Sequence, residues 1–101
     1  MAYTKEQIIA DITDYISKSG VKYWNEVYVG VSKDVKDRLF NGHGVIEQSD
    51  KWIYRQATSS AVARDIESYF INTLGATGGT GGGDDTADYV YAYKKESHTD
   101  P

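Results

Sequence analysis

Helix and strand patterns alternate along this chain, and the alternation constrains its fold more than any other sequence feature. Amphipathic stretches with apolar residues three and four positions apart predict three helices, over residues 5–18, 33–41 and 58–74. Short β-branched and aromatic runs predict three strands, over residues 27–31, 51–57 and 88–95. We therefore expect an α/β or α+β fold, with about three helices flanking a small three-stranded sheet in the order α-β-α-β-α-β. Strict alternation usually indicates parallel strands. The second predicted helix is short for a connection between parallel strands, however, so antiparallel or mixed pairing stays open.

Chain length and residue types limit the classes of protein that are possible. A chain of 101 residues buries roughly 65% of the surface that its unfolded form exposes, so we expect one domain over residues 1–101. The absence of cysteine excludes a disulfide scaffold, a thiolate zinc site and a cysteine nucleophile. No apolar run approaches the ~18 residues of a membrane span, and the first residues lack the pattern of a signal peptide. We therefore expect a soluble, cytoplasmic protein with no membrane partner.

Local signals predict how several segments begin and end. Thr4 and Gln7 have the spacing of a capping box at the start of the first helix. The glycine-rich segment 78–83 has neither a Gly-Lys-Ser/Thr ending nor a following helix, and two aspartates follow it directly. We therefore interpret it as a tight connection rather than a phosphate-binding loop. The polar tail from Glu96 is expected to fray.

The segment beginning at Val27 carries a specific motif. The strand Val27-Tyr28-Val29-Gly30 leads into a helix that contains Arg38, ten residues after Tyr28. An aromatic strand follows, and then a helix with the sequence Ala63-Arg64-Asp65-Ile66-Glu67. These fragments, in this order, resemble the second half of the signature of GIY-YIG nucleases. The resemblance covers about residues 27–75.

The resemblance implies a Mg²⁺- or Mn²⁺-dependent enzyme that cleaves phosphodiester bonds in nucleic acid. We expect DNA rather than RNA as the partner, although the sequence does not decide between them. It implies that Glu67 binds the metal, that Arg38 contacts the scissile phosphate and that Tyr28 positions or deprotonates the attacking water. His43 would be an auxiliary group near the phosphate. Phosphodiester cleavage adds negative charge to an anionic centre, so a cation and a fixed guanidinium suit it.

Three further cations are candidates for binding nucleic acid. Lys33, Lys36 and Arg55 could give the cleft a positive potential, although each could equally be an ordinary surface charge. The net charge of −4 argues mildly against a generic nucleic-acid coat protein, but not against an enzyme that acts on nucleic acid.

The first half of the family signature has no clean match upstream of Tyr28. One hypothesis is that Tyr89-Val90-Tyr91 forms the missing sheet edge from the other end of the chain. The missing motif and the acidic balance favour an alternative function, in which a catalytically degenerate domain binds nucleic acid or protein. A third possibility is a structural subunit that self-associates through the tyrosine-rich final strand as a sheet edge.

Each candidate also has an ordinary structural interpretation. Tyr28 could pack within the sheet, and Arg38 could pair with Asp34 one helical turn earlier. Glu67 could lie on a solvated helix face or pair with Arg64, and His43 could be an exposed loop residue. Catalysis instead predicts that Tyr28, Arg38 and Glu67 converge on one open concave surface within about 10 Å. A Glu67 side chain that faces away from Arg38 across the sheet would contradict it. The sequence leaves open the substrate structure, the oligomeric state, the pathway and the role of segment 78–83.

Overall fold

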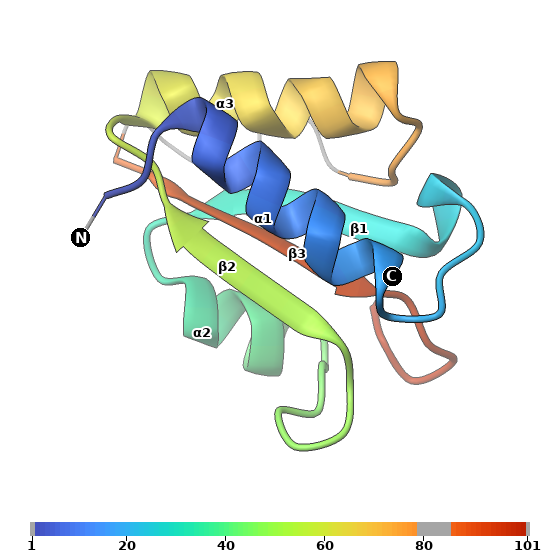
Figure 1. Ribbon diagram of the computed structural model, residues 1–101. Coiled ribbons are helices and arrows are strands. Elements are labelled where there is room, and N and C mark those ends of the chain that lie inside the picture. Colours follow the sequence, from blue (N-terminus) through green and yellow to red (C-terminus); the bar gives the residue numbers. More distant parts are fainter. Residues whose placement is uncertain (1, 79–85, 101) are drawn as a thin grey trace.

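The computed structural model describes residues 2–78 and 86–100, arranged in three layers (Figure 1). Helices α1 and α3 cover one face of a three-stranded sheet, and α2 covers the other face. Three irregular turns, η1–η3, complete the elements, and η2 and η3 continue α2 and α3 without a break. In chain order the elements are α1 (Lys5–Ser17), η1 (Trp24–Glu26), β1 (Val27–Ser32), α2 (Val35–Asp37), η2 (Arg38–Gly42), β2 (Trp52–Gln56), α3 (Ser60–Ser68), η3 (Tyr69–Thr73) and β3 (Tyr89–Lys94).

The first helix begins where the capping pattern predicts. The backbone N–H of Gln7 donates to Oγ1 of Thr4 at 3.2 Å, and the Thr4 N–H donates to Oε1 of Gln7 at 3.0 Å. These reciprocal bonds satisfy two N–H groups that the first turn leaves without helical partners. Ser59 caps α3 in the same way, since its hydroxyl accepts from the N–H of Val62 at 3.2 Å. The expected α+β class, with three helices and a three-stranded sheet, is confirmed.

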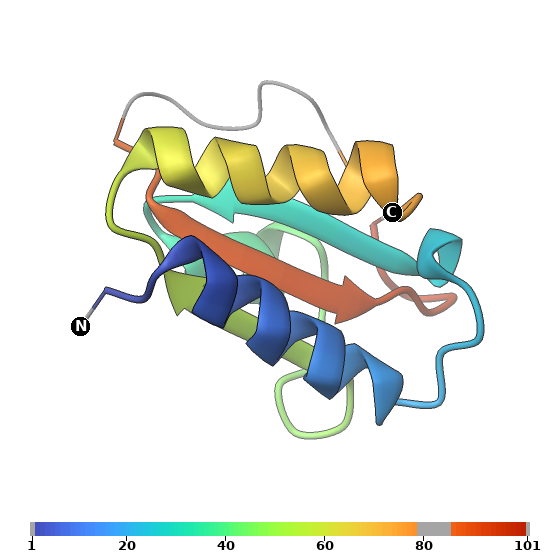
Figure 2. The same cartoon turned by 45° about the horizontal axis from the view of Figure 1, so that its top comes forward.

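The sheet has the order β1-β3-β2, and both pairs of strands are antiparallel. Of the pairings that the sequence leaves open, parallel and mixed pairing are therefore excluded. The short α2 connection places β2 one position away from β1, and β3 fills the space between them (Figure 2). The hypothesis that residues 89–91 form a sheet edge is also wrong, because β3 is hydrogen-bonded on both sides. For the same reason β3 cannot serve as an edge for self-association.

The alternation of residues in β3 separates two apolar clusters. Val90 and Ala92 face α1 and α3 in the larger cluster, together with Ile12, Ile66 and Phe70. Tyr91 and Tyr93 face the other way, and they pack with residues of the α2 side that include Val35, Leu39 and Val45. Successive side chains of a strand point to opposite faces, so the tyrosines gather on the face that carries α2.

The tail is held against the body of the protein, so the expectation that it frays is wrong. The backbone N–H of Asp100 donates to the carbonyl of His43 at 2.8 Å. The imidazole of His98 pairs with the carboxylate of Asp50 at 2.6 Å. These bonds attach the tail to the loop that follows η2.

Two further observations complete the fold. Most of the glycine-rich segment, residues 79–85, lies outside the described part of the chain. None of the described helices has both the length and the apolar character needed to cross a membrane.

Candidate functional site

The ring of Tyr91 lies across the backbone of Gly30. The two residues are directly opposite each other in the antiparallel pair of β1 and β3. A Cβ atom placed on Gly30 would lie 2.5 Å from the hydroxyl oxygen of Tyr91 and 2.6 Å from Cζ, closer than a real side chain can approach. Glycine is therefore required here by the close approach of a ring from the neighbouring strand.

The hydroxyl of Tyr91 is hydrogen-bonded to His43. Nε2 of His43 lies 2.7 Å from Oη of Tyr91, and Nδ1 lies 2.5 Å from the backbone carbonyl oxygen of Asp100. Only 6% of His43 is exposed, so the interpretation of this histidine as an exposed loop residue is wrong. Both ring nitrogens are engaged, and this fixes the orientation of the imidazole.

Tyr28 completes an aromatic cluster around this histidine. Its ring centroid lies 4.6 Å from that of His43, 5.4 Å from that of Tyr93 and 6.2 Å from that of Tyr91. Tyr28 is half-buried, whereas Tyr91 and Tyr93 are buried. Among these three tyrosines, Tyr28 is therefore the one that is partly open to solvent.

Arg38 is the first residue of η2 and is exposed to solvent. Burial lowers the pKa of His43 and raises that of Tyr91; the positive charge of Arg38 adds to the first shift and opposes the second, so its guanidinium lies within electrostatic reach of both groups. Asp34, the ordinary partner expected for Arg38, instead accepts a hydrogen bond from the N–H of Asp37 and caps α2.

Glu67 lies on α3, which covers the face of the sheet opposite to α2 and η2. Glu67 is 6% exposed, so the interpretation as a residue on a solvated helix face is wrong. Burial raises the pKa of Glu67, and the positive charge of Arg64 opposes this rise. The negative charge of Glu67 in turn raises the pKa of Tyr91, which places the carboxylate within electrostatic reach of the cluster.

Burial dominates the protonation of the cluster. It raises the pKa of Tyr91 and Tyr93 well above the ordinary value for tyrosine, and it lowers that of His43. Near neutral pH we therefore expect protonated phenols beside a neutral imidazole. A neutral imidazole has one donor and one acceptor nitrogen, so it can both receive and hold a proton.

One oxygen of Glu67, the buried Oε2, is left without a hydrogen-bond partner within the described part of the chain. No group of three or more acidic or histidine side chains lies together in that same part. Mg²⁺ often binds only one or two carboxylates, with water and substrate phosphate completing its shell. A single, otherwise unsatisfied carboxylate oxygen fits this pattern.

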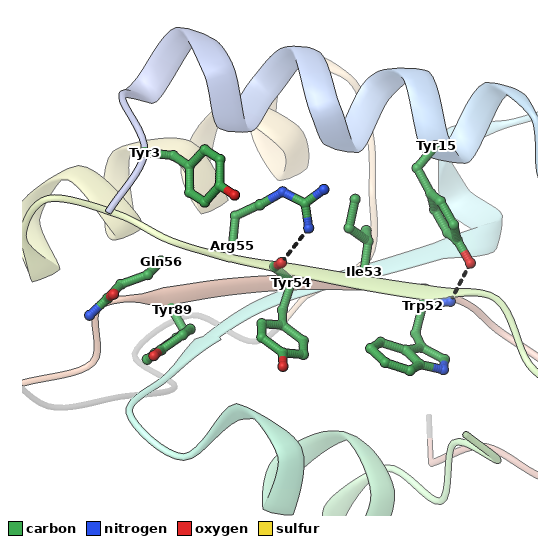
Figure 3. Close-up of a pocket in the computed structure, with 8 residues that line it drawn as sticks. All are labelled: Tyr3, Tyr15, Trp52, Ile53, Tyr54, Arg55, Gln56 and Tyr89. Atoms are coloured by element: carbon green, nitrogen blue, oxygen red, sulfur yellow. Dashed lines mark hydrogen bonds between the residues drawn. The ribbon is translucent and has the colours of Figure 1, made fainter. Parts of the chain in front are cut away.

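The three candidate nucleic-acid contacts lie elsewhere. Lys33 and Lys36 are exposed residues near the start of α2, and the electrostatic effects on His43 and Tyr91 come from Arg38 rather than from these lysines. Arg55 lies on the α1 side of β2, in a groove along the outer edge of the sheet (Figure 3). Its role and those of the lysines stay predictions.

Arg55 contacts several neighbouring residues within this groove. Nε of Arg55 pairs with Asp11 of α1 at 3.1 Å, and Nη1 donates to the carbonyl of Tyr54 at 2.8 Å. The guanidinium also lies 5.5 Å from the ring centre of Tyr3. Figure 3 shows Trp52 and Tyr54 pointing to the opposite side of β2. The structure therefore places Tyr28 and His43 in contact with Tyr91. Arg38 on η2 and Glu67 on α3 act on Tyr91 electrostatically from elements on opposite faces of the sheet, and Arg55 lies apart at the outer edge.

Tyr91 and Asp100 are the members of the cluster that the motif does not identify. The available signal for Tyr91 is the alternation of tyrosine with small apolar residues in β3, which predicts tyrosines on one face of a strand. The register that places Tyr91 opposite Gly30 depends on the insertion of β3 at the centre of the sheet. Asp100 acts through its backbone carbonyl, which carries no residue-specific signal.

No family model, curated protein or solved structure was found to match this chain.

Proposed function

We propose that this protein is a metal-dependent nuclease that cleaves phosphodiester bonds in nucleic acid. One observation carries the proposal. Nε2 of His43 lies 2.7 Å from the Tyr91 hydroxyl oxygen, and the Tyr28 ring packs against both residues. Arg38, from η2, which His43 caps, and Glu67, from α3, act on this hydroxyl electrostatically. The resemblance of residues 27–75 to the GIY-YIG signature supports the proposal independently.

The position of Tyr91 supports the proposal further. A GIY-YIG signature requires a second tyrosine-bearing strand before the Tyr-Val-Gly strand, and here no such strand precedes Tyr28. Strand β3 pairs with β1 and directs Tyr91 over Gly30. We infer that Tyr91 supplies the tyrosine of the missing first motif, in the order that a circular permutation of the signature would give.

The metal and the phosphate have separate binding groups in this proposal. Glu67 would hold Mg²⁺ or Mn²⁺ through its unsatisfied oxygen, and the ion would supply positive charge against the charge that develops on the phosphate. Arg38 is exposed and can donate to two phosphate oxygens, because its planar guanidinium matches phosphate geometry. The proposal requires the Glu67 carboxylate on α3 and the Arg38 guanidinium on η2, which lie on opposite faces of the sheet, to reach one phosphate.

Tyr91 and His43 handle the proton of the attacking water. The water oxygen bonds to phosphorus while its proton passes to Oη of Tyr91, and the proton of Tyr91 passes to Nε2 of His43. The bond from phosphorus to the leaving sugar oxygen breaks, and that oxygen takes a proton from solvent. Tyr28, the partly exposed tyrosine, orients the water beside this pair.

The acidic net charge of the chain favours one alternative, a domain that binds nucleic acid or protein without cleaving it. The net charge is −4, and Arg55 is committed to Asp11. Few cations therefore remain to replace the counterions of a nucleic acid. Cleavage that requires metal distinguishes the nuclease from this binding module.

The test is a cleavage assay at low salt, with Mg²⁺ or Mn²⁺, on labelled single-stranded, duplex and flap DNA and on RNA. Glu67→Ala and Arg38→Ala are expected to abolish cleavage while retaining the fold, and Glu47→Ala, an exposed glutamate, serves as the matched control. Equal activity in all preparations would indicate a contaminant and contradict the proposal. Absence of cleavage, together with absence of metal-induced NMR shifts near Glu67, would favour the binding module.

A further inference from the structure

The segment 96–100 forms a short turn, and two of its residues, His98 and Asp100, attach it to the loop that carries His43. Within the turn, the N–H of Glu96 donates to the hydroxyl of Thr99 at 3.0 Å, and the N–H of Thr99 donates to the Glu96 carbonyl at 3.1 Å. His98 pairs with Asp50, whose carboxylate also accepts from the N–H of Ile46 at 2.8 Å. The segment therefore has a defined shape and a fixed anchor beside the histidine loop.

Contacts between this segment and His43 are reciprocal. The N–H of Asp100 donates to the His43 carbonyl at 2.8 Å, and the Asp100 carbonyl oxygen lies 2.5 Å from Nδ1 of the His43 ring. The backbone of the segment also passes close to Gly44, where a Cβ atom would lie 3.3 Å from the His98 carbonyl oxygen. The backbone of one residue thus holds both the main chain and the side chain of the histidine.

The chemistry of the carbonyl determines where the proton of His43 lies. A carbonyl oxygen can only accept a hydrogen bond, so Nδ1 must carry the hydrogen. A neutral imidazole with a hydrogen on Nδ1 has a lone pair on Nε2. The 2.7 Å bond between Nε2 and Tyr91 can then form in one sense only, with the Tyr91 hydroxyl as the donor.

We propose that segment 96–100 is a positioning element for His43, in which the Asp100 carbonyl selects the Nδ1–H tautomer and so makes Nε2 the acceptor for the Tyr91 hydroxyl proton. Its importance for cleavage rests on the proposed nuclease function, but the tautomer itself does not. With the Tyr91 hydrogen directed toward His43, the lone pairs of Oη are free to accept a proton from water. The opposite tautomer would donate to Oη and occupy a lone pair.

The test measures the tautomer directly, by ¹⁵N NMR of the two ring nitrogens of His43 in the full chain. Asp100→Pro removes the N–H that anchors the segment, and Asp100→Ala is the matched control because it keeps both backbone contacts. The double variant His98→Ala/Asp100→Pro weakens both anchors without altering Tyr28, His43 or Tyr91. We expect Nδ1 to be protonated in the wild type and in Asp100→Ala. The tautomer ratio should shift toward Nε2–H by about fivefold for each hydrogen bond lost.

Cleavage kinetics add a second measurement. In the double variant kcat is expected to fall about tenfold or more, with KM little changed, because proton transfer and not substrate binding is affected. Protonated Nε2 in the wild type, or an unchanged tautomer in the folded double variant, would overturn the proposal. If the wild type shows the expected tautomer but does not cleave nucleic acid, the nuclease proposal fails and the positioning role stands.

Discussion

Tyr91 and Gly30 lie directly opposite each other on neighbouring strands, and the tyrosine ring occupies the space where a side chain on residue 30 would be. This contact places the hydroxyl of Tyr91 beside His43 and within reach of the charges of Arg38 and Glu67. The glycine of the Tyr-Val-Gly strand thus has a physical role, which is to admit a ring from β3.

The first prediction concerns Gly30→Ala. The added methyl group would lie 2.5 Å from the Tyr91 oxygen, so the ring must move and lose its hydrogen bond to His43. Overpacking of this kind lowers the free energy of unfolding by typically about 1–3 kcal/mol, and cleavage is expected to fall with it. Chemical denaturation and the cleavage assay measure the two effects. In Gly30→Ala/Tyr91→Ala, stability should recover in part while cleavage does not. Full activity in Gly30→Ala would contradict the role of this contact.

A second prediction follows from the burial of Glu67. Because burial raises the pKa of Glu67 above its ordinary value of 4.5, the stabilisation from the protonated carboxyl is complete below that value. It is lost as the pH rises through the pKa of the folded protein. Near neutral pH, Glu67→Gln should therefore increase the free energy of unfolding of the metal-free protein and at the same time abolish cleavage.

Thermal unfolding with and without Mg²⁺ tests this pair of effects. Added Mg²⁺ should raise the midpoint of the wild type, because a ligand of the folded state stabilises that state, and it should leave Glu67→Gln unchanged. Glu47→Gln, at an exposed position, should behave as the wild type does. An equal response of wild type and Glu67→Gln to Mg²⁺ would show that the cation binds elsewhere.

A third prediction concerns the pH dependence of stability. Burial lowers the pKa of His43 from its ordinary value of 6.5, so the unfolded chain binds a proton at this residue more tightly than the folded protein does. The contribution of His43 to stability is complete above pH 6.5 and is lost as the pH falls below that value toward the pKa of the folded protein. Urea denaturation between pH 5 and 8 should show a steeper loss on acidification for wild type than for His43→Gln. Parallel curves for the two proteins would contradict the lowered pKa.

Sequence patterns predicted the elements well because their signals are local. The capping pair Thr4 and Gln7 and the apolar periodicity of α1 act within one or two turns of helix. The pairing of strands was not predictable in this way. The central position of β3 depends on contacts between residues about 60 apart, such as Gly30 and Tyr91, and no local pattern encodes that register.

The residues of the candidate site fall into the same two groups, those that a local motif identifies and those that long-range contacts bring in. Tyr28, Arg38 and Glu67 follow one another at recognisable spacings, so a motif can identify them. Tyr91 reaches the cluster through long-range strand pairing, and Asp100 reaches it through a backbone carbonyl. Residue identity carries little information about either contact. The tail was expected to fray because its polar composition gives no sign of its hydrogen bonds to His43.

The most direct measurement is the rate of metal-dependent cleavage of labelled DNA by wild type, Tyr91→Phe and Tyr89→Phe. Both substitutions remove one hydroxyl from the same face of β3, but only Tyr91 donates to His43. We predict that Tyr91→Phe lowers kcat by about 10²-fold or more with its fold intact, and that Tyr89→Phe changes kcat by less than about threefold. Equal rates for Tyr91→Phe and wild type, or wild-type cleavage that persists without a divalent cation, would contradict the account.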